Sequence, residues 1–103
     1  RGESYNGHTP SADYFGAYSF DGFAAALWAV FHTDSGTAAV VKAANVLGDA
    51  DSISCMAGQL SGAFYGAQGF DARLVQQLRE WDPECEVELR AVMLEHVGMM
   101  RKD

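Results

Sequence analysis

Two aspartates and a serine lie within four residues in the stretch NVLGDADSISCMAGQLSGAFYG, which runs from Asn45 to Gly66. Asp49, Asp51 and Ser52 offer carboxylate and hydroxyl oxygens, the hard ligands that suit Mg²⁺, Ca²⁺ or Mn²⁺ better than zinc. An EF-hand is excluded, because a loop counted from Asp49 would need glycine at its sixth position and glutamate at its twelfth, where the chain has serine and leucine. The spacing indicates either another kind of metal site or simple helix capping.

Capping is the simpler interpretation of these three residues. Asp51 or Ser52 would cap the following helix, and Asp49 would favour its positive end, each charge contributing about 0.3–1 kcal/mol. Adjacent carboxylates repel one another, however, and a bound dication removes that repulsion. The tetrad D-x-D-S by itself favours capping, so its surroundings have to decide.

Three helices are expected to position this turn. Six residues of the first, all apolar, share one helix face: Phe20, Phe23, Ala24, Leu27, Trp28 and Phe31. Ser19 or Asp21 is the expected cap, and the helix is apolar nearly all round, so we expect it to be covered on most sides. The second helix is predicted from Thr37 to Leu47, with Gly48 ending it, and the third from Ser52 to Tyr65.

Small residues recur every four positions along the third predicted helix, at Ser54, Gly58, Gly62 and Gly66. Glycine costs about 1 kcal/mol relative to alanine inside a helix. The repeat therefore predicts a face on which another helix backbone packs unusually close.

The two ends of the chain differ in character. Residues 1–18 are rich in Gly, Ser, Asn and Pro and predict an irregular approach with turns. Asp71 is expected to cap a short helix with Leu74, Val75 and Leu78 inward, and Asp82-Pro83 is expected to open a charged surface helix over residues 83–100. No segment follows a strand period, so the predicted fold class is all-α.

The overall composition restricts partners and location. The 103 residues suffice for one small domain, with 49% hydrophobic and 20% charged residues. A net charge of −7 argues against nucleic acid or an anionic membrane surface as the main partner, and no apolar run is long enough to span a bilayer. Two cysteines and no secretory signal indicate a reducing compartment, so a cytoplasmic location is expected.

The segments DYFGAYSFDGFAAALWAVFHTDS and AANVLGDADSISCMAGQLSGAFYG resemble the C-terminal part of the ADP-ribosylglycohydrolase family. The shared pattern is an apolar A-L-W helix, an H-T-D-S turn, N-x-x-G-D-x-D-[ST] and A-G-x-x-x-G-A-x-Y-G, in that order. It covers about residues 13–66, and the tail from Leu78 to Val97 fits more loosely. Leu47 departs from the pattern, since many family members have a second glycine there.

The resemblance implies a fold of packed helices and a cleft that binds two Mg²⁺ ions, with Mn²⁺ as an alternative. Asp49, Asp51 and Ser52 match the family's metal ligands. It further implies hydrolysis of the glycosidic bond that joins ADP-ribose to an arginine nitrogen or a serine oxygen of a modified protein. The substrate partner would thus be ADP-ribose or an ADP-ribosylated protein.

The resemblance also implies that the domain is incomplete. Octahedral Mg²⁺ takes six oxygens per ion, more than three residues can supply to two ions. The family's other ligands lie in an N-terminal motif of consecutive aspartates, which residues 1–103 lack. We therefore expect this chain to be the C-terminal portion of a longer hydrolase, with the missing N-terminal part as its partner, and to be inactive alone.

Several residues and functions stay open. Tyr14, Phe15, Tyr18 and Phe20 form an aromatic cluster that either packs in the core or contacts substrate, since the resemblance places this segment beside the cleft. Tyr18 and Ser19 are the candidate substrate contacts. His8 and His32 are more readily explained as solvated or capping residues than as an acid or base. Alternative functions are a non-catalytic structural or binding relative, and a metal-dependent hydrolase of another nucleotide-like substrate.

Overall fold

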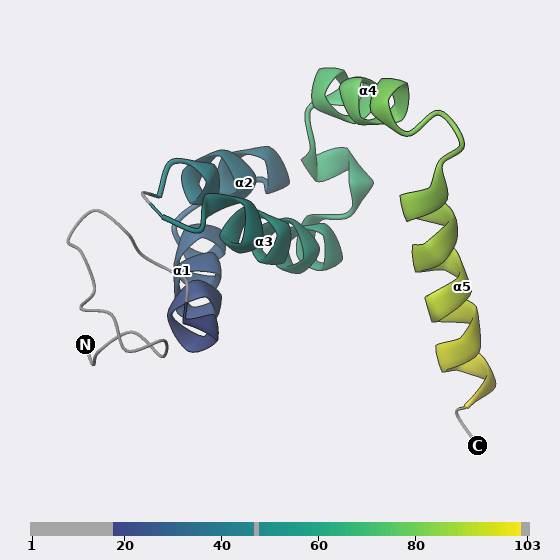
Figure 1. Ribbon diagram of the computed structural model, residues 1–103, viewed down its shortest axis with the longest axis horizontal. Coiled ribbons are helices and arrows are strands. Elements are labelled where there is room, and N and C mark those ends of the chain that lie inside the picture. The colour runs from purple at the N-terminus through teal and green to yellow at the C-terminus, as the bar shows by residue number, and fades with distance from the viewer. Residues whose placement is uncertain (1–17, 47, 102–103) are drawn as a thin grey trace. The chain divides into compact units, whose positions relative to one another are not determined.

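The computed structural model describes residues 18–46 and 48–101, which form five α-helices and one short 3-10 helix (Figure 1). The helices are α1 (Ser19–Phe31), α2 (Gly36–Ala44), α3 (Ala50–Tyr65), η1 (Ala67–Gly69), α4 (Ala72–Trp81) and α5 (Glu86–Met100). The all-α prediction is confirmed. The irregular approach predicted for residues 1–18 lies, apart from Tyr18, outside the described residues, as does Leu47. None of the described helices is long and apolar enough to cross a membrane.

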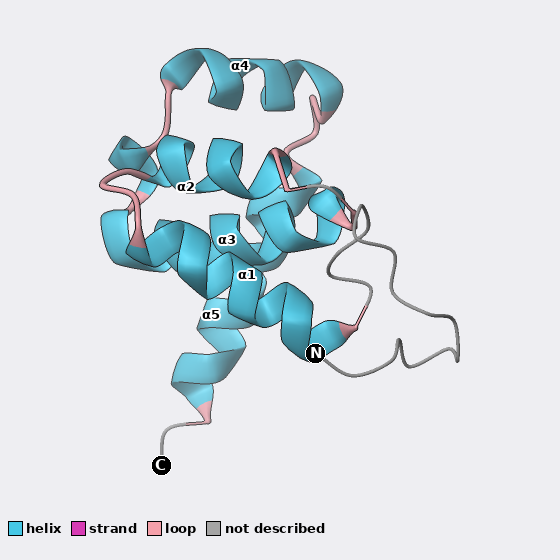
Figure 2. Ribbon diagram, turned by 90° about the vertical axis from the view of Figure 1, so that its left-hand side faces the viewer, coloured by secondary structure: helices cyan, strands magenta, loops and turns pink. Residues whose placement is uncertain are grey.

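The chain divides into two compact units, here called unit 1 (residues 1–70) and unit 2 (residues 71–103). In unit 1, α1, α2 and α3 lie side by side and each contacts the other two (Figures 1 and 2). Short connections join consecutive helices, so α2 runs back along its neighbours, while α1 and α3 run in the same direction. The hydroxyl of Tyr65, at the end of α3, donates to the carbonyl oxygen of Thr33, just after α1, at 3.0 Å.

Helix α1 buries the face opposite to the one that its large residues occupy. Its buried residues are all small: Gly22, Ala25, Ala26 and Ala29. Phe20 and Phe31 are 71% and 84% exposed within the described structure. The periodicity was ambiguous because the helix is apolar on every side, and short side chains let α2 and α3 approach closely. The predicted caps are wrong, since Tyr18 precedes the helix and provides no side-chain cap.

Helix α2 begins at Gly36, one residue before the prediction, and ends at Ala44, three residues early. Ser35 caps its start, because the Ser35 hydroxyl oxygen accepts a hydrogen bond from the Ala38 amide at 3.1 Å. At its end the Asn45 side-chain amide donates to the Val41 carbonyl oxygen at 2.7 Å. Polar side chains at both ends therefore set the limits of the helix.

Helix α3 begins at Ala50, two residues earlier than predicted, and buries Ile53, Ala57 and Ser61 rather than the small-residue row. The Ser61 hydroxyl donates to the Ala57 carbonyl oxygen at 2.6 Å, so this buried polar group is satisfied. A Cβ at Gly58 would meet a Val40 methyl group at 3.5 Å, an ordinary contact. The prediction of an unusually close helix backbone along the glycines is therefore wrong, because side chains fill that space.

Unit 2 contains α4 and α5, and none of its described residues is buried. Asp71 caps α4 as predicted, but Leu74 and Leu78 are about half exposed within the unit rather than inward. Helix α5 starts at Glu86 instead of Pro83. The Asp82 carboxylate accepts from the Glu86 and Val87 amides at 3.2 and 3.1 Å, and Cys85 takes a left-handed conformation, φ 55°. The predicted surface character of this helix is confirmed within the unit.

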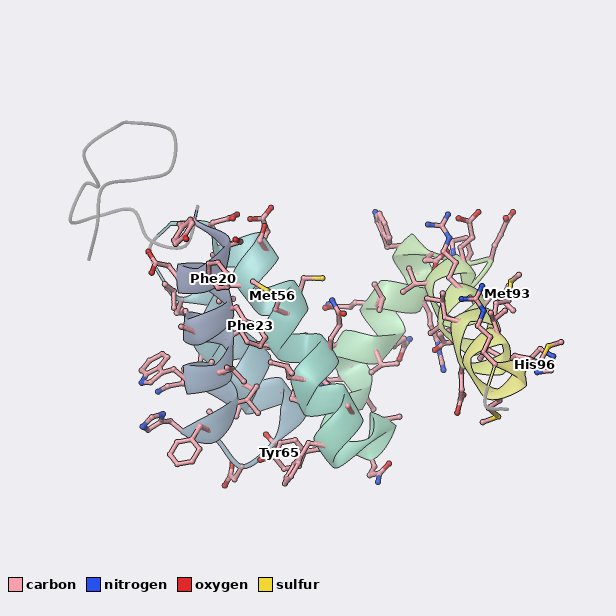
Figure 3. The ribbon with its side chains drawn as sticks, turned by 90° about the horizontal axis from the view of Figure 1, so that it is seen from below. Phe20, Phe23, Met56, Tyr65, Met93 and His96 are labelled. Atoms are coloured by element: carbon pink, nitrogen blue, oxygen red, sulfur yellow. The ribbon has the colours of Figure 1, made fainter. Side chains whose placement is uncertain are left out.

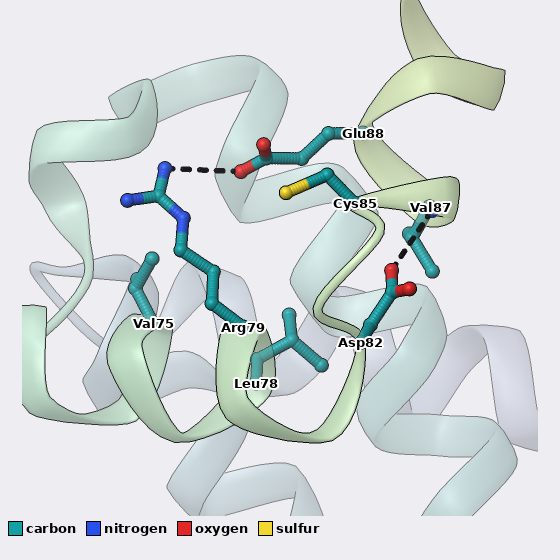
Figure 4. Close-up of a pocket in the computed structure, with 7 residues that line it drawn as sticks. All are labelled: Val75, Leu78, Arg79, Asp82, Cys85, Val87 and Glu88. Atoms are coloured by element: carbon teal, nitrogen blue, oxygen red, sulfur yellow. Dashed lines mark hydrogen bonds and ion pairs between the residues drawn. The ribbon is translucent and has the colours of Figure 1, made fainter.

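A small cavity lies between α4 and the start of α5 (Figure 4). Its volume is about 40 Å³, and it is lined by Val75, Leu78, Arg79, Asp82, Cys85, Val87 and Glu88. The ion pair between Arg79 and Glu88, 3.2 Å long, lies at its edge. The volume holds little more than one water molecule, so the cavity is a packing defect rather than a ligand site.

Candidate metal centre

The turn that carries the candidate ligands depends on Gly48. Its φ of 129° lies in a region that residues with a Cβ rarely adopt. The Ala50 amide donates to the Gly48 carbonyl oxygen at 2.8 Å, which closes the turn tightly before α3. Asp49 therefore stands at the entry of α3, with Asp51 and Ser52 in its first turn.

The two aspartates stand in different environments at this turn. Asp49 is half-buried, whereas Asp51 and Ser52 are exposed. The pKa of Asp51 is lowered, mainly by a hydrogen bond with the Asp49 side chain and further by bonds from the amides of Ser52 and of Asp51 itself. Neither aspartate forms an ion pair with any residue that the structure describes. The pair is thus a concentrated acidic group without a protein cation.

Capping accounts for only part of this arrangement. Asp49 occupies the capping position of α3, yet its side chain accepts no capping hydrogen bond; its main-chain oxygen instead accepts from the Ile53 amide at 3.1 Å. The amides of Ser52 and of Asp51 itself help to lower the pKa of Asp51, as the start of a helix favours a carboxylate. The position of Asp51 thus suits the positive end of the helix, whereas the carboxylate of Asp49 makes no capping hydrogen bond.

The donor set fits a hard divalent cation that keeps most of its water ligands. Neighbouring carboxylates repel one another, and a bound dication removes that repulsion. Asp49, Asp51 and Ser52 supply only oxygen donors. Among residues 18–46 and 48–101 no group of three or more His, Cys, Asp or Glu side chains comes together. These three residues would therefore supply one side of a metal centre.

Tyr18 and Ser19, the candidate substrate contacts, lie at the start of α1. Because α1 and α3 run in the same direction, the start of α1 lies at the same end of unit 1 as the Asp49–Ser52 turn. In Figure 3, Phe20, Phe23 and Met56 lie toward that end and Tyr65 toward the other. Tyr18 is 42% exposed, and its ring meets the ring of Phe20 edge-on at 5.6 Å between centroids. The fold thus brings the two sets of predicted residues to one end.

His32 lies at the opposite end of α1. Its Nδ1 donates to the Trp28 carbonyl oxygen at 2.9 Å, which agrees with a role at the end of the helix rather than as an acid or base beside Asp49. His8, Tyr14 and Phe15 lie outside the described residues.

Sequence reasoning missed two features of the site. It did not foresee that the Asp49 side chain lowers the pKa of Asp51, and it assigned Gly48 only to ending a helix. The glycine directly before D-x-D was the available signal, since glycine readily adopts the positive φ found at this turn.

Comparison with known proteins identifies the family of the chain. The model of the ADP-ribosylglycohydrolase family matches residues 4–101, so the chain belongs to that family. It is 43% identical over 61 residues to the ADP-ribosylarginine hydrolase Tri1 of Pseudomonas putida, a match that covers 59% of this chain and 16% of the relative. The Tri1 protein of Serratia proteamaculans is 42% identical over 66 residues, covering 60% of this chain and 18% of that relative. No solved structure matches the chain significantly.

The chain therefore spans less than a fifth of the length of the curated relatives that it matches. That residues 1–103 form the C-terminal portion of a longer domain stays a prediction, as do the metal ligands and the substrate contacts.

Proposed function

We propose that this chain supplies the metal-binding part of an Mg²⁺-dependent hydrolase that cleaves the glycosidic bond between ADP-ribose and an arginine side chain of a modified protein. The observation that carries the proposal is that Asp49, Asp51 and Ser52 stand together at the turn before α3 and in its first turn, where neither aspartate pairs with a cation of the described residues. Family membership supports the reaction class, and the names of both relatives support arginine over serine as the attachment site.

The residues of the turn would each have a defined role. Asp49, Asp51 and Ser52 would hold Mg²⁺ or Mn²⁺ through carboxylate and hydroxyl oxygens. When bound, the metal would supply Lewis-acid stabilisation of charge that develops as the glycosidic bond breaks. Tyr18 and Ser19, at the same end of unit 1, would contact the substrate and orient it toward the turn.

The same proposal predicts that residues 1–103 are inactive alone. Three ligand residues cannot complete a two-ion centre, so the remaining ligands would come from family sequence outside this chain. Hydrolysis of an ADP-ribosylarginine peptide by the isolated chain would contradict this part of the proposal.

Metal titration by calorimetry tests the ligands directly. We expect weak binding of Mg²⁺ and Mn²⁺ by the wild-type chain and at least about 10-fold weaker binding by Asp51→Asn. Asp34→Asn is the matched control, because Asp34 is also exposed and lies in another turn of unit 1. Equal metal affinity of the wild type and Asp51→Asn would show that Asp51 is not a metal ligand.

Catalysis is tested in a chimera of the P. putida relative in which residues 18–70 of this chain replace the aligned stretch. We expect Mg²⁺-dependent release of ADP-ribose from an ADP-ribosylarginine peptide, lowered about 100-fold or more by Asp51→Asn. An ADP-ribosylserine peptide serves as the comparison substrate. A folded chimera that binds Mg²⁺ but releases no ADP-ribose would favour the non-catalytic alternative.

A further inference from the structure

Helix α1 has two faces of opposite character. The face toward α2 and α3 consists of glycine and alanine, at Gly22, Ala25, Ala26 and Ala29. The outward face consists of large apolar side chains, here called the α1 ridge: Phe20, Phe23, Leu27 and Phe31. At 100° per residue the two faces point in opposite directions, so no rotation of the helix could bury both against α2 and α3.

The α1 ridge is exposed in unit 1 to an extent unusual for a globular protein. Phe23 and Leu27 are each 45% exposed, and the two flanking phenylalanines more so. A contiguous apolar surface of this kind marks a contact with another apolar surface, since burying each such side chain is worth about 1.5–3 kcal/mol. The small residues on the inner face are those of a helix that packs within a layer rather than at the surface.

Charge excludes some partners for the α1 ridge. Asp21 is the only charged residue of α1, and no lysine or arginine lies on the helix. The α1 ridge itself offers no cation to an anionic membrane surface or a nucleic acid; Lys42 of α2 lies over the ring of Trp28, which is not part of the ridge, at 4.4 Å from its centroid. The ridge therefore suits an uncharged apolar surface of another protein segment.

The lengths of the relatives indicate which protein segment would cover the α1 ridge. The matched stretch is 16% and 18% of the two Tri1 proteins, so most of each family chain lies outside it. We propose that the α1 ridge is the surface on which the rest of an ADP-ribosylglycohydrolase domain docks, through an apolar helix of that remainder. This proposal rests on the proposed function, because the docked segment would bring the missing ligands to the end where Asp49 and Asp51 lie.

Thiol accessibility tests the docking surface separately from catalysis. Phe23→Cys is made in the 103-residue chain with Cys55 and Cys85 replaced by serine, and in the chimera described above with Cys55 and any cysteine of the relative replaced by serine. We expect a maleimide to label Cys at position 23 at the rate of an exposed thiol in the chain and at least about 100-fold more slowly in the folded chimera. Asn45→Cys, at the exposed polar position that directly follows α2, is the labelling control in the chain.

The outcomes distinguish the docking surface from the hydrolase assignment. A protected thiol in a chimera without activity would support the docking surface and contradict the hydrolase. Rapid labelling in an active chimera would overturn the docking surface alone. Slow labelling in the isolated chain, with a dimer detected by light scattering, would show that a second copy covers the α1 ridge and would also overturn the proposal.

Discussion

At the scale of single residues, Asp49 and Asp51 differ in environment although one residue separates them. Asp49 is half-buried in the turn, whereas Asp51 is exposed and receives amide hydrogen bonds at the helix start. The backbone of Gly48 permits this contrast, because its φ of 129° reverses the chain just before the pair. We infer that Gly48, although it offers no ligand side chain, influences the orientation of the candidate ligands Asp49 and Asp51.

Gly48→Ala tests that dependence. A Cβ at this φ is strained, so we expect the stability of unit 1 to fall by about 1–3 kcal/mol and binding of Mg²⁺ to weaken with it. Urea unfolding measures the first effect and calorimetry the second. Gly98→Ala is the control, since Gly98 lies in α5 with no atom within 4 Å of an added Cβ, and it is expected to stabilise α5 by up to about 1 kcal/mol. Unchanged stability of Gly48→Ala would show that the turn tolerates another conformation.

At the scale of elements, the start of α4 depends on one carboxylate. Asp71 accepts from the Arg73 amide at 2.8 Å and pairs with the Arg73 guanidinium at 3.1 Å. The guanidinium hydrogen bond, followed by the amide, lowers the pKa of Asp71 below its ordinary value of 3.8. A lowered pKa means that the stabilisation is present above pH 3.8 and is lost as the pH falls through the folded-state value.

We therefore expect the first turn of α4 to unfold progressively as the pH falls below 3.8, measured by amide exchange at Arg73 and Leu74. Asp71→Asn keeps a capping oxygen but does not titrate, so this variant is expected to lose that pH dependence. The same pH dependence in Asp71→Asn would place the titrating group elsewhere.

The start of α2 is packed tightly against one aromatic ring, that of Phe70. A Cβ at Gly36 would lie 2.6–2.8 Å from three ring atoms of Phe70, whereas one at Gly62 would lie 3.8 Å from the same ring. We expect Gly36→Ala to destabilise unit 1 by about 1–3 kcal/mol, and Gly62→Ala to stabilise it by up to about 1 kcal/mol. A double-mutant cycle with Phe70→Leu measures the coupling. Additive effects of Gly36→Ala and Phe70→Leu would show that the ring is not the cause.

The sequence predicted which segments are helical, because breakers such as Asp34-Ser35-Gly36 separate clear helical periods. It placed the start of α5 too early, because the Asp82 carboxylate accepts from the amides of Glu86 and Val87, four and five residues further on. It also could not choose the buried face of α1, because a helix that is apolar all round carries no directional signal. The D-x-D-S motif predicted the candidate ligands, whereas the shared direction of α1 and α3 appeared only in the fold.

At the scale of the whole molecule, the two units differ in how much they bury. Among the described residues, the core of unit 1 consists of buried alanines and Ile53 with partly buried Val30, Val46, Met56 and Leu60 against it, whereas unit 2 has no buried residue. Small cores leave little net stability after the cost of chain ordering, and an isolated 15-residue helix is marginal in water. Any stability of this chain is therefore expected to reside in unit 1.

Native-state hydrogen exchange tests this difference in the 103-residue chain. We expect the slowest amides at Ile53 and Ala57 in α3, and α5 amides that exchange almost as fast as those of a free helical peptide. Protection in α5 equal to that in α3 would show that α5 is covered, either by another part of this chain or by a second copy.

The hydrogen bond of Tyr65 bears on the position of the candidate metal-binding turn at the other end of α3. Between Asp51 and Tyr65, α3 is a rod of about 21 Å, since a helix rises 1.5 Å per residue. The alanine row fixes its separation from α1, while the Tyr65 hydroxyl holds its far end to Thr33. A rotation of α3 by about 5° about its C-terminal end would displace its first residue by about 2 Å. That displacement is several times the positional tolerance of about 0.5 Å for groups in a functional site. The hydrogen bond at the C-terminal end of α3 thus helps to fix the position of Asp49 and Asp51 at its N-terminal end.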